Sequence, residues 1–392
     1  MPDYQRLFAA FPPASRQDWE QQLTKDLKGR SLADLNWQLE EHLRLSPLQT
    51  AEDLPRSTSP LTSGRPDNTW QIGEYIEVAD LGAANAQALE GLVGGCNAPL
   101  FRLHHLPNVE ELKILLADIE PHFISAHFAP LYPGRDPAEL FRNLIYYVRY
   151  RGVELADISG SMDFDPLLDW TDPPFRALAR ILRFADRYMP NFKVLQVNGQ
   201  VLHTGIENTS RELALLLAKG TEYLAQLDLL GIPPALTNRH LQFTVATSTS
   251  YFVEIAKIRA LKILWANVLN GYQLPGAPIP PVAAHLAPES QTPQTEYNMI
   301  MAATQAMAAA IGGADLVYVL PANFAKNEPS TAFTRRIARN VQHLLQLESG
   351  LNRVVDPAAG SYFLDNLTQQ LCAQAWQRFQ EIEKSGGYLN LA

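Results

Sequence analysis

Three histidines and one aspartate near the ends of predicted strands are the side chains best suited to hold a catalytic metal. They are His104, His127, Asp157 and His203. On a barrel, metal ligands converge from several strand ends, and a metal held there could activate water for hydrolysis. The sequence has neither an HExxH motif nor a His-x-His pair. We therefore expect no metal, and we interpret these residues as hydrogen-bonded polar groups at strand ends.

Two carboxylates in the segment SGSMDFDPLLDW, Asp163 and Asp165, could serve as an acid–base pair. Residues two positions apart share a face only where the chain is extended, so a solvated turn is the favoured interpretation. The neighbouring Ser159-Gly160-Ser161 lacks the flanking pattern of a nucleophile elbow. No acyl-transfer serine is predicted.

Two further sets of polar residues could have either a functional or a purely structural role. Arg335, Arg336 and Arg339 form a basic helix face that could meet an acidic partner or a phosphate, although a solvated face is the simpler reading. His203 stands in the stretch VNGQVLHTG, between a predicted strand and a helix start, where either a general base or an inert loop histidine could lie. Spacing alone therefore gives no convincing catalytic set.

Short apolar runs alternate with longer amphipathic segments, which is typical of βα units around a parallel sheet. Strands are expected at residues 98–105, 122–128, 152–159, 192–198, 241–247, 278–284, 315–320 and 353–364. Eight such alternations favour an α/β fold of the (β/α)8 TIM-barrel type over an open doubly wound sheet. The glycine-rich turns GxGxxG and GxxxxGK are absent from the sequence.

Helices follow from apolar spacing and from end signals. Thr209 and Glu212 form a capping-box pattern at one helix start, and Gly350 is expected to end another in the left-handed conformation. In residues 250–271 the expected apolar face consists of Phe252, Ile255, Leu261, Leu264 and Val268. It leaves four charged residues largely elsewhere, namely Glu254, Lys257, Arg259 and Lys262. In residues 330–350 the expected apolar face consists of Phe333, Ile337, Val341 and Leu344. A last helix is expected from about Asn366 to Lys384.

The first part of the chain differs from the rest. Residues 15–45 predict a short helix followed by an extended return, and the stretch 55–69, rich in Pro, Ser, Thr and Gly, reads as a linker. We expect an N-terminal arm over 1–60 and the barrel over 61–392.

Composition excludes several classes of partner. The 392 residues are 46% hydrophobic, and 32 basic against 41 acidic residues give a net charge of -9. A negative net charge does not favour binding to nucleic acid or to an anionic membrane surface. No run in the sequence approaches the roughly 20 apolar residues of a membrane span. Cys96 and Cys372 lack the spacing of a disulfide framework or zinc site, and no export signal is visible, so a cytoplasmic location is expected.

Several long segments resemble the barrel domain of methylmalonyl-CoA mutase. They include TEYNMIMAATQAMAAAIGGADLVYVLP (295–321), TRRIARNVQHLLQLESGLNRVVDPAAGSYFLDNLT (334–368), FVEIAKIRALKILWANV (252–268), TWQIGEYIEV (69–78) and FPPASRQDWEQQLTKDLKG (11–29). The resemblance covers nearly the whole chain. It implies a (β/α)8 barrel that threads acyl-CoA along its axis and, in the family, joins a cobalamin-binding domain.

The sequence departs from the family's pattern at positions where the resemblance places the family's catalytic and binding residues. The catalytic chain of the family carries a Tyr-His pair directly after the glycine that matches Gly199, whereas this sequence has Gln200 and Val201. Arg65 falls where the resemblance places the family's radical-shielding tyrosine. The family's QTSGW-like substrate segment is not reproduced in AHLAPESQTP (284–293), and no histidine follows an aspartate by two residues, as the cobalt-ligating DxHxxG motif requires. We predict no catalytic residues, and we expect Gln200, His203 and His285 to be candidates for facing the barrel lumen.

This pattern resembles the small, non-catalytic subunit of heterodimeric bacterial mutases. The leading hypothesis is a silent barrel without a cobalamin domain, whose N-terminal arm embraces a catalytic large subunit that uses adenosylcobalamin to interconvert methylmalonyl-CoA and succinyl-CoA. A homodimer stays open. An alternative is an active acyl-CoA mutase barrel of altered specificity, in which Gln200 and Arg65 recognise the substrate and a separate protein supplies cobalamin. A third is a module that binds acyl-CoA without converting it.

Overall fold

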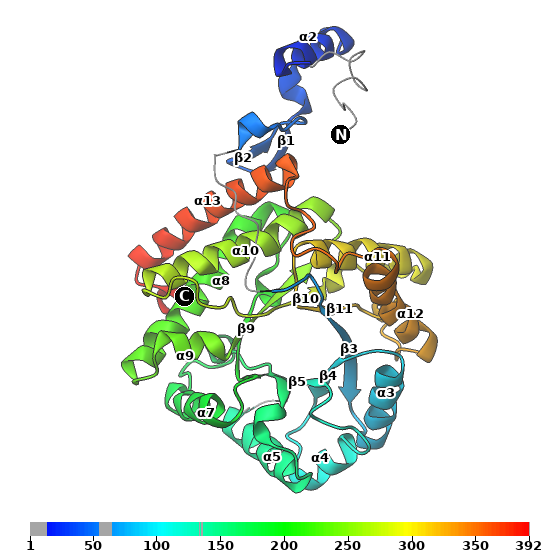
Figure 1. Cartoon of the computed structure of the whole chain (residues 1–392), viewed down its shortest axis with the longest axis vertical. Helices are drawn as coiled ribbons and strands as arrows, with labels where there is room; N and C mark the ends of the chain where they lie inside the picture. The colour runs from blue at the N-terminus through cyan, green and yellow to red at the C-terminus, as the bar shows by residue number, and fades with distance from the viewer. Residues whose placement is uncertain (1–13, 55–64, 133, 135, 392) are drawn as a thin grey trace, which may run out of the picture.

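A computed structural model of the chain describes residues 14–54, 65–132, 134 and 136–391. Residues 1–13 of the predicted arm and residues 55–64 of the predicted linker at 55–69 lie outside the described residues. Within the described part, parallel strands surround a central axis and helices lie outside them (Figure 1). The expected (β/α)8 barrel is confirmed.

Nine strand segments form the barrel sheet of the described chain, in the order β7-β6-β5-β4-β3-β11-β10-β9-β8, and all their pairings are parallel. They are β3 (Gln71–Val78), β4 (Ala98–Leu103), β5 (Ser125–Pro130), β6 (Ser159–Met162), β7 (Phe192–Lys193), β8 (Leu195–Asn198), β9 (Leu241–Thr247), β10 (Val282–Leu286) and β11 (Leu316–Tyr318).

The barrel closes because β7 and β8 are two pieces of one strand position. Only Val194 separates them, and β7 pairs with β6 while β8 pairs with β9. The backbone N–H of Gln196 also donates to the carbonyl oxygen of Phe164, which joins β8 to the chain that follows β6. The interrupted strand thus counts once, and eight strand positions remain.

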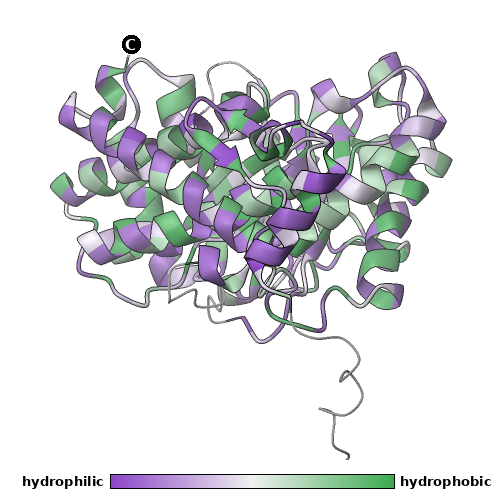
Figure 2. Cartoon of the chain, turned by 90° about the horizontal axis from the view of Figure 1, so that it is seen from above, coloured by the Kyte–Doolittle hydropathy of each residue, from purple (hydrophilic) through white to green (hydrophobic). Residues whose placement is uncertain are grey.

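The helices form the outer layer and carry hydrophobic and hydrophilic residues mixed along their length (Figure 2). They are α3 (Leu81–Val93), α4 (Val109–Leu115), α5 (Pro137–Tyr150), α6 (Pro166–Asp169), α7 (Phe175–Tyr188), α8 (Thr209–Leu229), α9 (Pro234–Arg239), α10 (Tyr251–Gly271), α11 (Thr295–Ile311), α12 (Ala332–His343) and α13 (Tyr362–Lys384). Helices α8, α10 and α13 pack against one another. A π-helical turn, η8 (Leu344–Glu348), extends α12, and Gly350 follows it in the expected left-handed conformation.

The sequence missed one strand, assigned one that does not form and placed the start of a third too early. The first barrel strand is β3, whose polar Glu74 and Glu77 obscure the apolar alternation of a buried strand. The last expected strand, 353–364, is a loop that leads into α13, where the Ser361 side chain accepts a hydrogen bond from the Leu364 N–H and caps the helix. The strand expected at 152–159 begins only at Ser159, after a 3-10 turn over Leu155–Asp157.

One glycine is required by close strand packing. Gly160 in β6 has φ of 137°, and a Cβ built there would lie 1.9 Å from the carbonyl oxygen of Ala126 on β5. A side chain at this position would force the two strands apart. The glycine therefore sets the path of β6 toward the polar groups at its carboxyl end.

Buried charges, not an apolar face alone, hold α10 in place. Glu254, Lys257, Arg259 and Lys262 are all at most 4% exposed, so their expected position away from the core is wrong, while Phe252 of the predicted apolar face is 48% exposed. Lys257 is sandwiched between Glu212 and Glu254, with N···O distances of 3.3 and 2.8 Å. Burial alone would lower the pKa of Lys257, but the two carboxylates outweigh it and raise the pKa.

The described part of the N-terminal arm has a helix and a hairpin, which matches the expected short helix and extended return. Helix α2 (Arg16–Asp26) precedes strands β1 (Trp37–Glu40) and β2 (Leu43–Leu45), which pair antiparallel. The hairpin docks on the barrel near α13, whereas α2 stands beyond it, away from the barrel (Figure 1). The hairpin is therefore part of the folded unit, and α2 projects from it.

Candidate functional site

The candidate site is a cavity of about 240 Å³ at the carboxyl ends of the barrel strands. Active sites of barrels of this class form at this end, because side chains from several strands converge there. Its polar lining consists of Tyr75, Arg102, Asp163, Asp165, Gln196, Asn198, Gln200 and His285. Two of the three residues expected in the lumen, Gln200 and His285, thus line the cavity, and His203 does not.

Three aromatic rings, two of them stacked, lie beside the cavity. Tyr318 of β11 stacks on His285 of β10 with ring centroids 4.6 Å apart, and Tyr75 of β3 lies 5.5 Å from Tyr318. The Tyr318 ring lies over Gly73, where a Cβ would come within 2.3 Å of it. The glycine thus admits a ring that fills part of the barrel interior.

The His285 ring is held by a single hydrogen bond. Its Nδ1 is 2.8 Å from the Tyr75 hydroxyl, while its Nε2 is buried without a hydrogen-bond partner among the described residues. Burial lowers the pKa of His285 to about 3, so this histidine is neutral at physiological pH. A neutral ring with one free nitrogen can either donate to or accept from a ligand.

A chain of hydrogen bonds leads from β5 to the carboxyl group of Asp163. The Ser161 hydroxyl donates to Asp163 Oδ1 at 2.6 Å, so it must accept from His127 Nδ1–H at 2.7 Å. His127 Nε2 then accepts from the Ser125 hydroxyl at 3.0 Å. Burial lowers the pKa of His127 to about 3, which fits a neutral ring in this role. Every donor in the chain therefore points toward Asp163.

The sequence had suggested that Asp163 lies in a solvated turn. The structure instead places its carboxyl group among the polar residues that line the cavity. Burial raises the pKa of its carboxyl to about 6, against the opposing hydrogen bonds from Ser161 and Gln196. No Lys or Arg among the described residues forms an ion pair with it within 4.0 Å. The cavity thus contains a carboxyl group with neutral hydrogen-bond donors only.

Asp165 is also buried, at 2% exposure, but it has a structural role. Its carboxylate accepts from Lys219 Nζ at 2.9 Å, from the Tyr223 hydroxyl at 2.5 Å and from the Asn198 N–H at 2.8 Å. The charge of Asp165 is therefore neutralised within the protein, and the expected solvated turn is wrong for both aspartates. Asp165 ties α8 to the ends of β6 and β8.

The mouth loop after β8 carries Gln200 and Val201, which the sequence resemblance had placed at the family's catalytic positions. Gln200 lines the cavity, whereas Val201 is 52% exposed. The side chain of His203 is 3% exposed, with Nδ1 2.9 Å from Glu212 and Nε2 3.4 Å from Glu289. Glu212 is thus held by His203 and Lys257, and the expected capping box does not form, since Thr209 instead donates to the Ile206 carbonyl oxygen. His203 is thus a loop residue whose buried side chain contacts two carboxylates.

Other predicted residues lie outside the cavity. Arg65 donates to the carbonyl oxygens of Gly313 and Thr69, next to the amino ends of β11 and β3. His104 is paired with Glu77 on the surface, and Asp157 belongs to the 3-10 turn before β6. The structure does not bring these residues together with His127 and His203, and the described residues hold no group of three or more His, Cys, Asp or Glu side chains arranged for a metal.

The basic helix face is mostly internal. Arg339 donates to the buried Glu74, and Arg335 contacts Glu90 at 2.5 Å, so only Arg336 of the three is exposed. Glu74 comes from β3, the strand missed in the sequence. The expectation of a solvated basic face is therefore wrong for Arg335 and Arg339, because their charges join α12 to β3 and α3.

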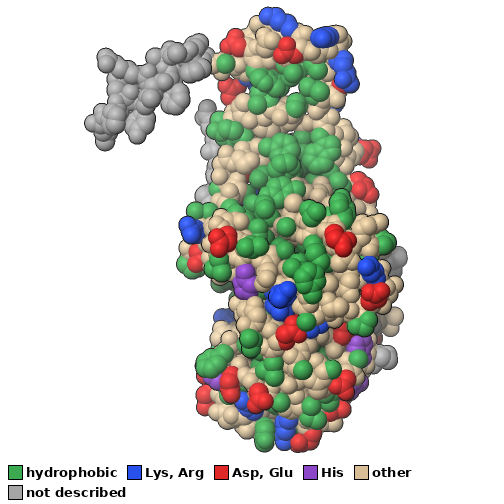
Figure 3. Space-filling view, turned by 90° about the vertical axis from the view of Figure 1, so that its right-hand side faces the viewer, with side chains coloured by type: hydrophobic (Ala, Val, Ile, Leu, Met, Phe, Trp, Pro, Cys, Tyr) green, Lys and Arg blue, Asp and Glu red, His purple; other side chains and the backbone are tan. Residues whose placement is uncertain are grey.

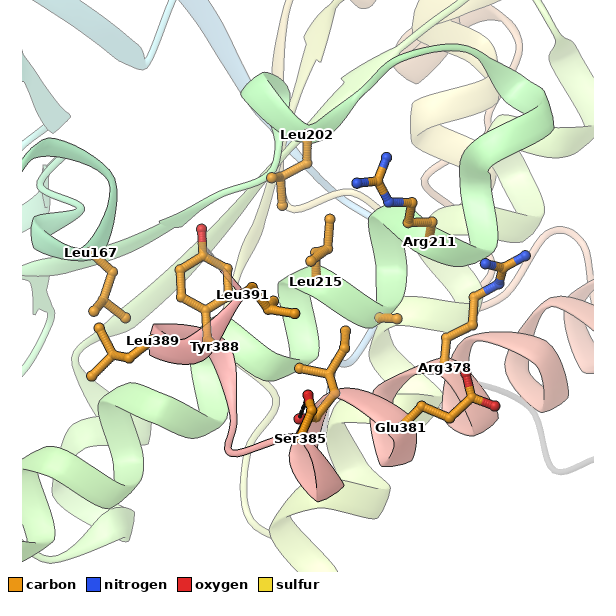
Figure 4. A pocket seen from close by; sticks show the side chains of 12 residues that line it. Leu167, Leu202, Arg211, Leu215, Arg378, Glu381, Ser385, Tyr388, Leu389 and Leu391 are labelled. Atoms are coloured by element: carbon orange, nitrogen blue, oxygen red, sulfur yellow. Dashed lines mark hydrogen bonds between the residues drawn. The ribbon is translucent and has the colours of Figure 1, made fainter.

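A larger cavity of about 650 Å³ lies against the outer layer, between α8, α13 and the short turn η9 (Tyr388–Asn390) (Figure 4). Its lining is mostly aliphatic, with Arg211 and Arg378 at one side. None of the polar side chains at the strand ends described above lines this cavity. It is therefore separate from the candidate site.

Sequence reasoning missed most of the site's polar partners. Tyr75 lies on the missed strand, and Gln196, Gln242 and Tyr318 lie within apolar runs that were read only as strands. The two-residue periodicity of strands could have revealed part of the site. Two pairs of polar residues are spaced two positions apart on or next to neighbouring strands, namely Ser125 with His127 and Ser161 with Asp163. Such pairs face the same side of the sheet, which here is the barrel interior.

The fold and the mouth site define a closed parallel α/β barrel with a small polar cavity at its carboxyl end. The family model described as Methylmalonyl-CoA mutase matches residues 105–391. The chain is 31% identical to the methylmalonyl-CoA mutase small subunit of Porphyromonas gingivalis, over 99% of this chain and 66% of that protein. The chain belongs to the methylmalonyl-CoA mutase family.

Two further comparisons give the share of a related protein and of a solved structure that the chain matches. The chain is 29% identical to a methylmalonyl-CoA mutase of Cereibacter sphaeroides over 94% of its own length and 58% of that protein. It thus spans about two thirds or less of these relatives. Among solved structures, a dihydropteroate synthase from Stenotrophomonas maltophilia matches 71% of this chain and 93% of that chain, with 14% identity and a TM-score of 0.41.

Proposed function

We propose that the chain acts as a small-subunit-type barrel, catalytically silent, that pairs in the cytoplasm with a catalytic large mutase chain. The observation that carries this proposal is the mouth loop, where Gln200 and Val201 stand in place of the Tyr-His pair expected in a catalytic chain. Losing one positioned acid–base or hydrogen-bonding group costs roughly 10²–10⁴ in rate. Relatives that align over nearly the whole chain are named small subunits, which supports the pairing.

The free helix α2 supports a partner. It has 11 residues and no buried one, and Trp19, Leu23 and Leu27 recur every four positions along one side. Isolated helices shorter than about 12–15 residues are marginal in water, so most helices depend on packing of an apolar face. A partner chain that covers this side would supply that packing.

An exposed apolar face on the barrel also supports a partner. Large hydrophobic residues are exposed along α11 and the α12–η8 segment: Tyr297, Ile300, Phe333, Leu344 and Leu347. Phe333 and Leu344 had been expected in the core, but Thr334, Ala338 and Arg339 turn inward instead. The view from this side shows hydrophobic side chains from the arm down across the barrel (Figure 3). Apolar surfaces of this kind mark protein interfaces.

Cobalamin does not fit the groups that this chain offers. None of its nine histidines follows an aspartate by two residues. The unpartnered Nε2 of His285 lies at a cavity of about 240 Å³, which is too small for a corrin ring. We therefore assign adenosylcobalamin to the catalytic partner.

The proposal is tested by mixing the purified chain with catalytic large mutase chains that carry the Tyr-His pair and DxHxxG. A 1:1 complex in size-exclusion chromatography with light scattering is expected, and the complex should isomerise methylmalonyl-CoA. The chain alone, with adenosylcobalamin, should not. Failure to co-elute with every such chain, or a stable homodimer that excludes them, would contradict the pairing.

A second candidate is favoured by the lumen itself. Gln200 and the half-buried Asp163 both line the cavity, which would suit an active barrel of altered acyl specificity or a module that only binds acyl-CoA. Turnover of any acyl-CoA, with adenosylcobalamin and a cobalamin-domain protein present, would favour the active barrel. Saturable binding of CoA esters in calorimetry without turnover would favour the binding module.

A further inference from the structure

The cavity at the barrel mouth carries one charge, on Asp163, that no residue in the described part of the chain neutralises with an ion pair. Arg102 is paired with Glu77 at 2.5 Å, and Asp165 with Lys219 at 2.9 Å. Asp163 has only neutral partners, namely Ser161 at 2.6 Å and Gln242 at 3.5 Å, besides Gln196. Asp163 is half-buried and poorly solvated, so a carboxylate there without a cation partner is costly, and a bound cation would relieve that cost.

A second, independent group points to a ligand. His285 is 3% exposed and lines the same cavity, and its Nε2 has no hydrogen-bond partner within the described chain. Buried polar atoms in proteins are nearly always paired, by protein or by a bound molecule. If the Tyr75 hydroxyl accepts from Nδ1–H, then Nε2 is an acceptor for an N–H group.

The rim of the cavity differs from its polar interior. Leu131, Leu168 and Phe324, from the loops after β5, β6 and β11, line the cavity and are 37–42% exposed. A ligand with a charged head and a short apolar body would match both parts. At about 240 Å³ the cavity takes only a small molecule.

We propose that the barrel mouth binds a small alkylammonium ligand, with its N–H groups between the Asp163 carboxylate and His285 Nε2 and its alkyl part against the apolar rim. The same geometry disfavours a carboxylate ligand, because a second negative charge would face Asp163 in a poorly solvated space. The inference does not depend on pairing with a mutase chain. Asp163 is thus the residue that sets ligand charge.

The charge of Asp163 makes the binding pH-dependent. The titratable groups that face it from the surrounding elements are Tyr75, Arg102, His127, Asp165, His285 and Tyr318. The pKa values of both histidines are lowered to about 3 and those of both tyrosines are raised, all by burial, while Arg102 and Asp165 are held in ion pairs. Asp163, with its pKa of about 6, changes charge between pH 5 and 7.5, whereas the shifted pKa values of the two histidines and two tyrosines lie outside that range.

The test compares three probes of matched size, n-propylammonium, propionamide and propionate, by NMR titration of the full chain at pH 7.5. We expect the ammonium to bind at least about tenfold more tightly than propionate, and about tenfold more weakly at pH 5 than at pH 7.5. D163N should abolish the preference. E110Q, which alters a carboxylate 77% exposed on α4, should keep it.

The outcomes are decisive in either direction. Equal or tighter binding of propionate, an unchanged preference in D163N, or no binding of any probe would overturn the proposal. If D163N does not fold, the pH comparison on the unaltered chain still decides, because ammonium binding that is the same at pH 5 and 7.5 excludes Asp163 as the partner. Co-elution with a mutase chain is measured separately, so the two proposals can fail independently.

Discussion

Glu40 of the N-terminal hairpin accepts a hydrogen bond of 2.8 Å from the backbone N–H of Ser210, 170 residues further along the chain. The Ser210 hydroxyl donates to the same carboxylate. Ser210 lies in the first turn of α8, where backbone N–H groups lack helical partners and the helix dipole favours negative charge. One buried carboxylate thus anchors the hairpin, and with it the direction in which α2 projects.

Replacing Glu40 with Ala should destabilise the chain by roughly 1–3 kcal/mol, because the Ser210 groups lose their acceptor in a buried place. The free energy of unfolding, measured by urea denaturation, checks this. The neighbouring E41A is the control, since the Glu41 side chain is 83% exposed and its loss should cost no more than about 0.5 kcal/mol. Equal stability of the two variants would show that the hairpin is not anchored in this way.

Replacing Asp163 with Asn should change how stability depends on pH. The folded pKa of about 6 lies above the ordinary 3.8, so the folded chain holds this proton more tightly than the unfolded chain. The stability that this carboxyl contributes is complete below pH about 4 and is lost as the pH rises through 6. Urea midpoints should therefore fall between pH 4.5 and 7.5 by the equivalent of 1–2 kcal/mol more in the parent than in D163N, on the order expected from linkage.

E110Q is the matched control for that comparison, because it also removes one carboxylate charge but at an exposed position. Its pH profile should follow that of the parent. A D163N profile that also follows the parent would mean that Asp163 is not buried in a desolvated site.

The barrel was predictable from the sequence because most of its strands and helices have a recognisable local pattern of apolar residues. Residues 241–247 were expected as a strand and form β9, and α8 and α10 follow the predicted ranges closely. The errors come from partners that are remote in sequence. Glu74 and Arg339 are 265 residues apart, and each looks solvent-exposed until the other is placed beside it. Apolar periodicity alone could therefore recover neither β3 nor the inward face of α12.

The same limit explains why the polar site was only partly predicted. Asp163 sits two residues from Asp165, and the sequence gives no sign that Lys219 neutralises one and leaves the other without a cation. His203 attracted attention as a candidate base, yet it is buried between two carboxylates of other segments. Gln200 was singled out through the family resemblance and not through any local pattern, and in the structure it lines the cavity two residues after the end of β8.

Replacing Lys257 with Met should be strongly destabilising. Lys257 is fully buried between Glu212 and Glu254 and also donates to the Ala246 carbonyl oxygen at 2.7 Å. Removal of one partner from a buried ion pair costs about 3–5 kcal/mol, since the remaining charges are left unpaired. Thermal and urea unfolding measure the loss, with K25M on the exposed side of α2 as the control. A loss below about 1 kcal/mol would show that the two glutamates find other partners.

The combined variant W19A/L23A should separate partner binding from stability. Neither side chain is buried in the described chain, so the free energy of unfolding should change by no more than about 0.5 kcal/mol. If α2 packs on a catalytic mutase chain, the same variant should lose at least about tenfold in affinity for it, because large apolar side chains dominate such contacts. Surface plasmon resonance against the large chain measures the affinity, with Q21A/K25A as the control, since both of these residues are exposed on the helix. Equal affinity of parent and W19A/L23A would place the contact elsewhere, and the exposed residues Ile300 and Leu347 would then be the next positions to alter.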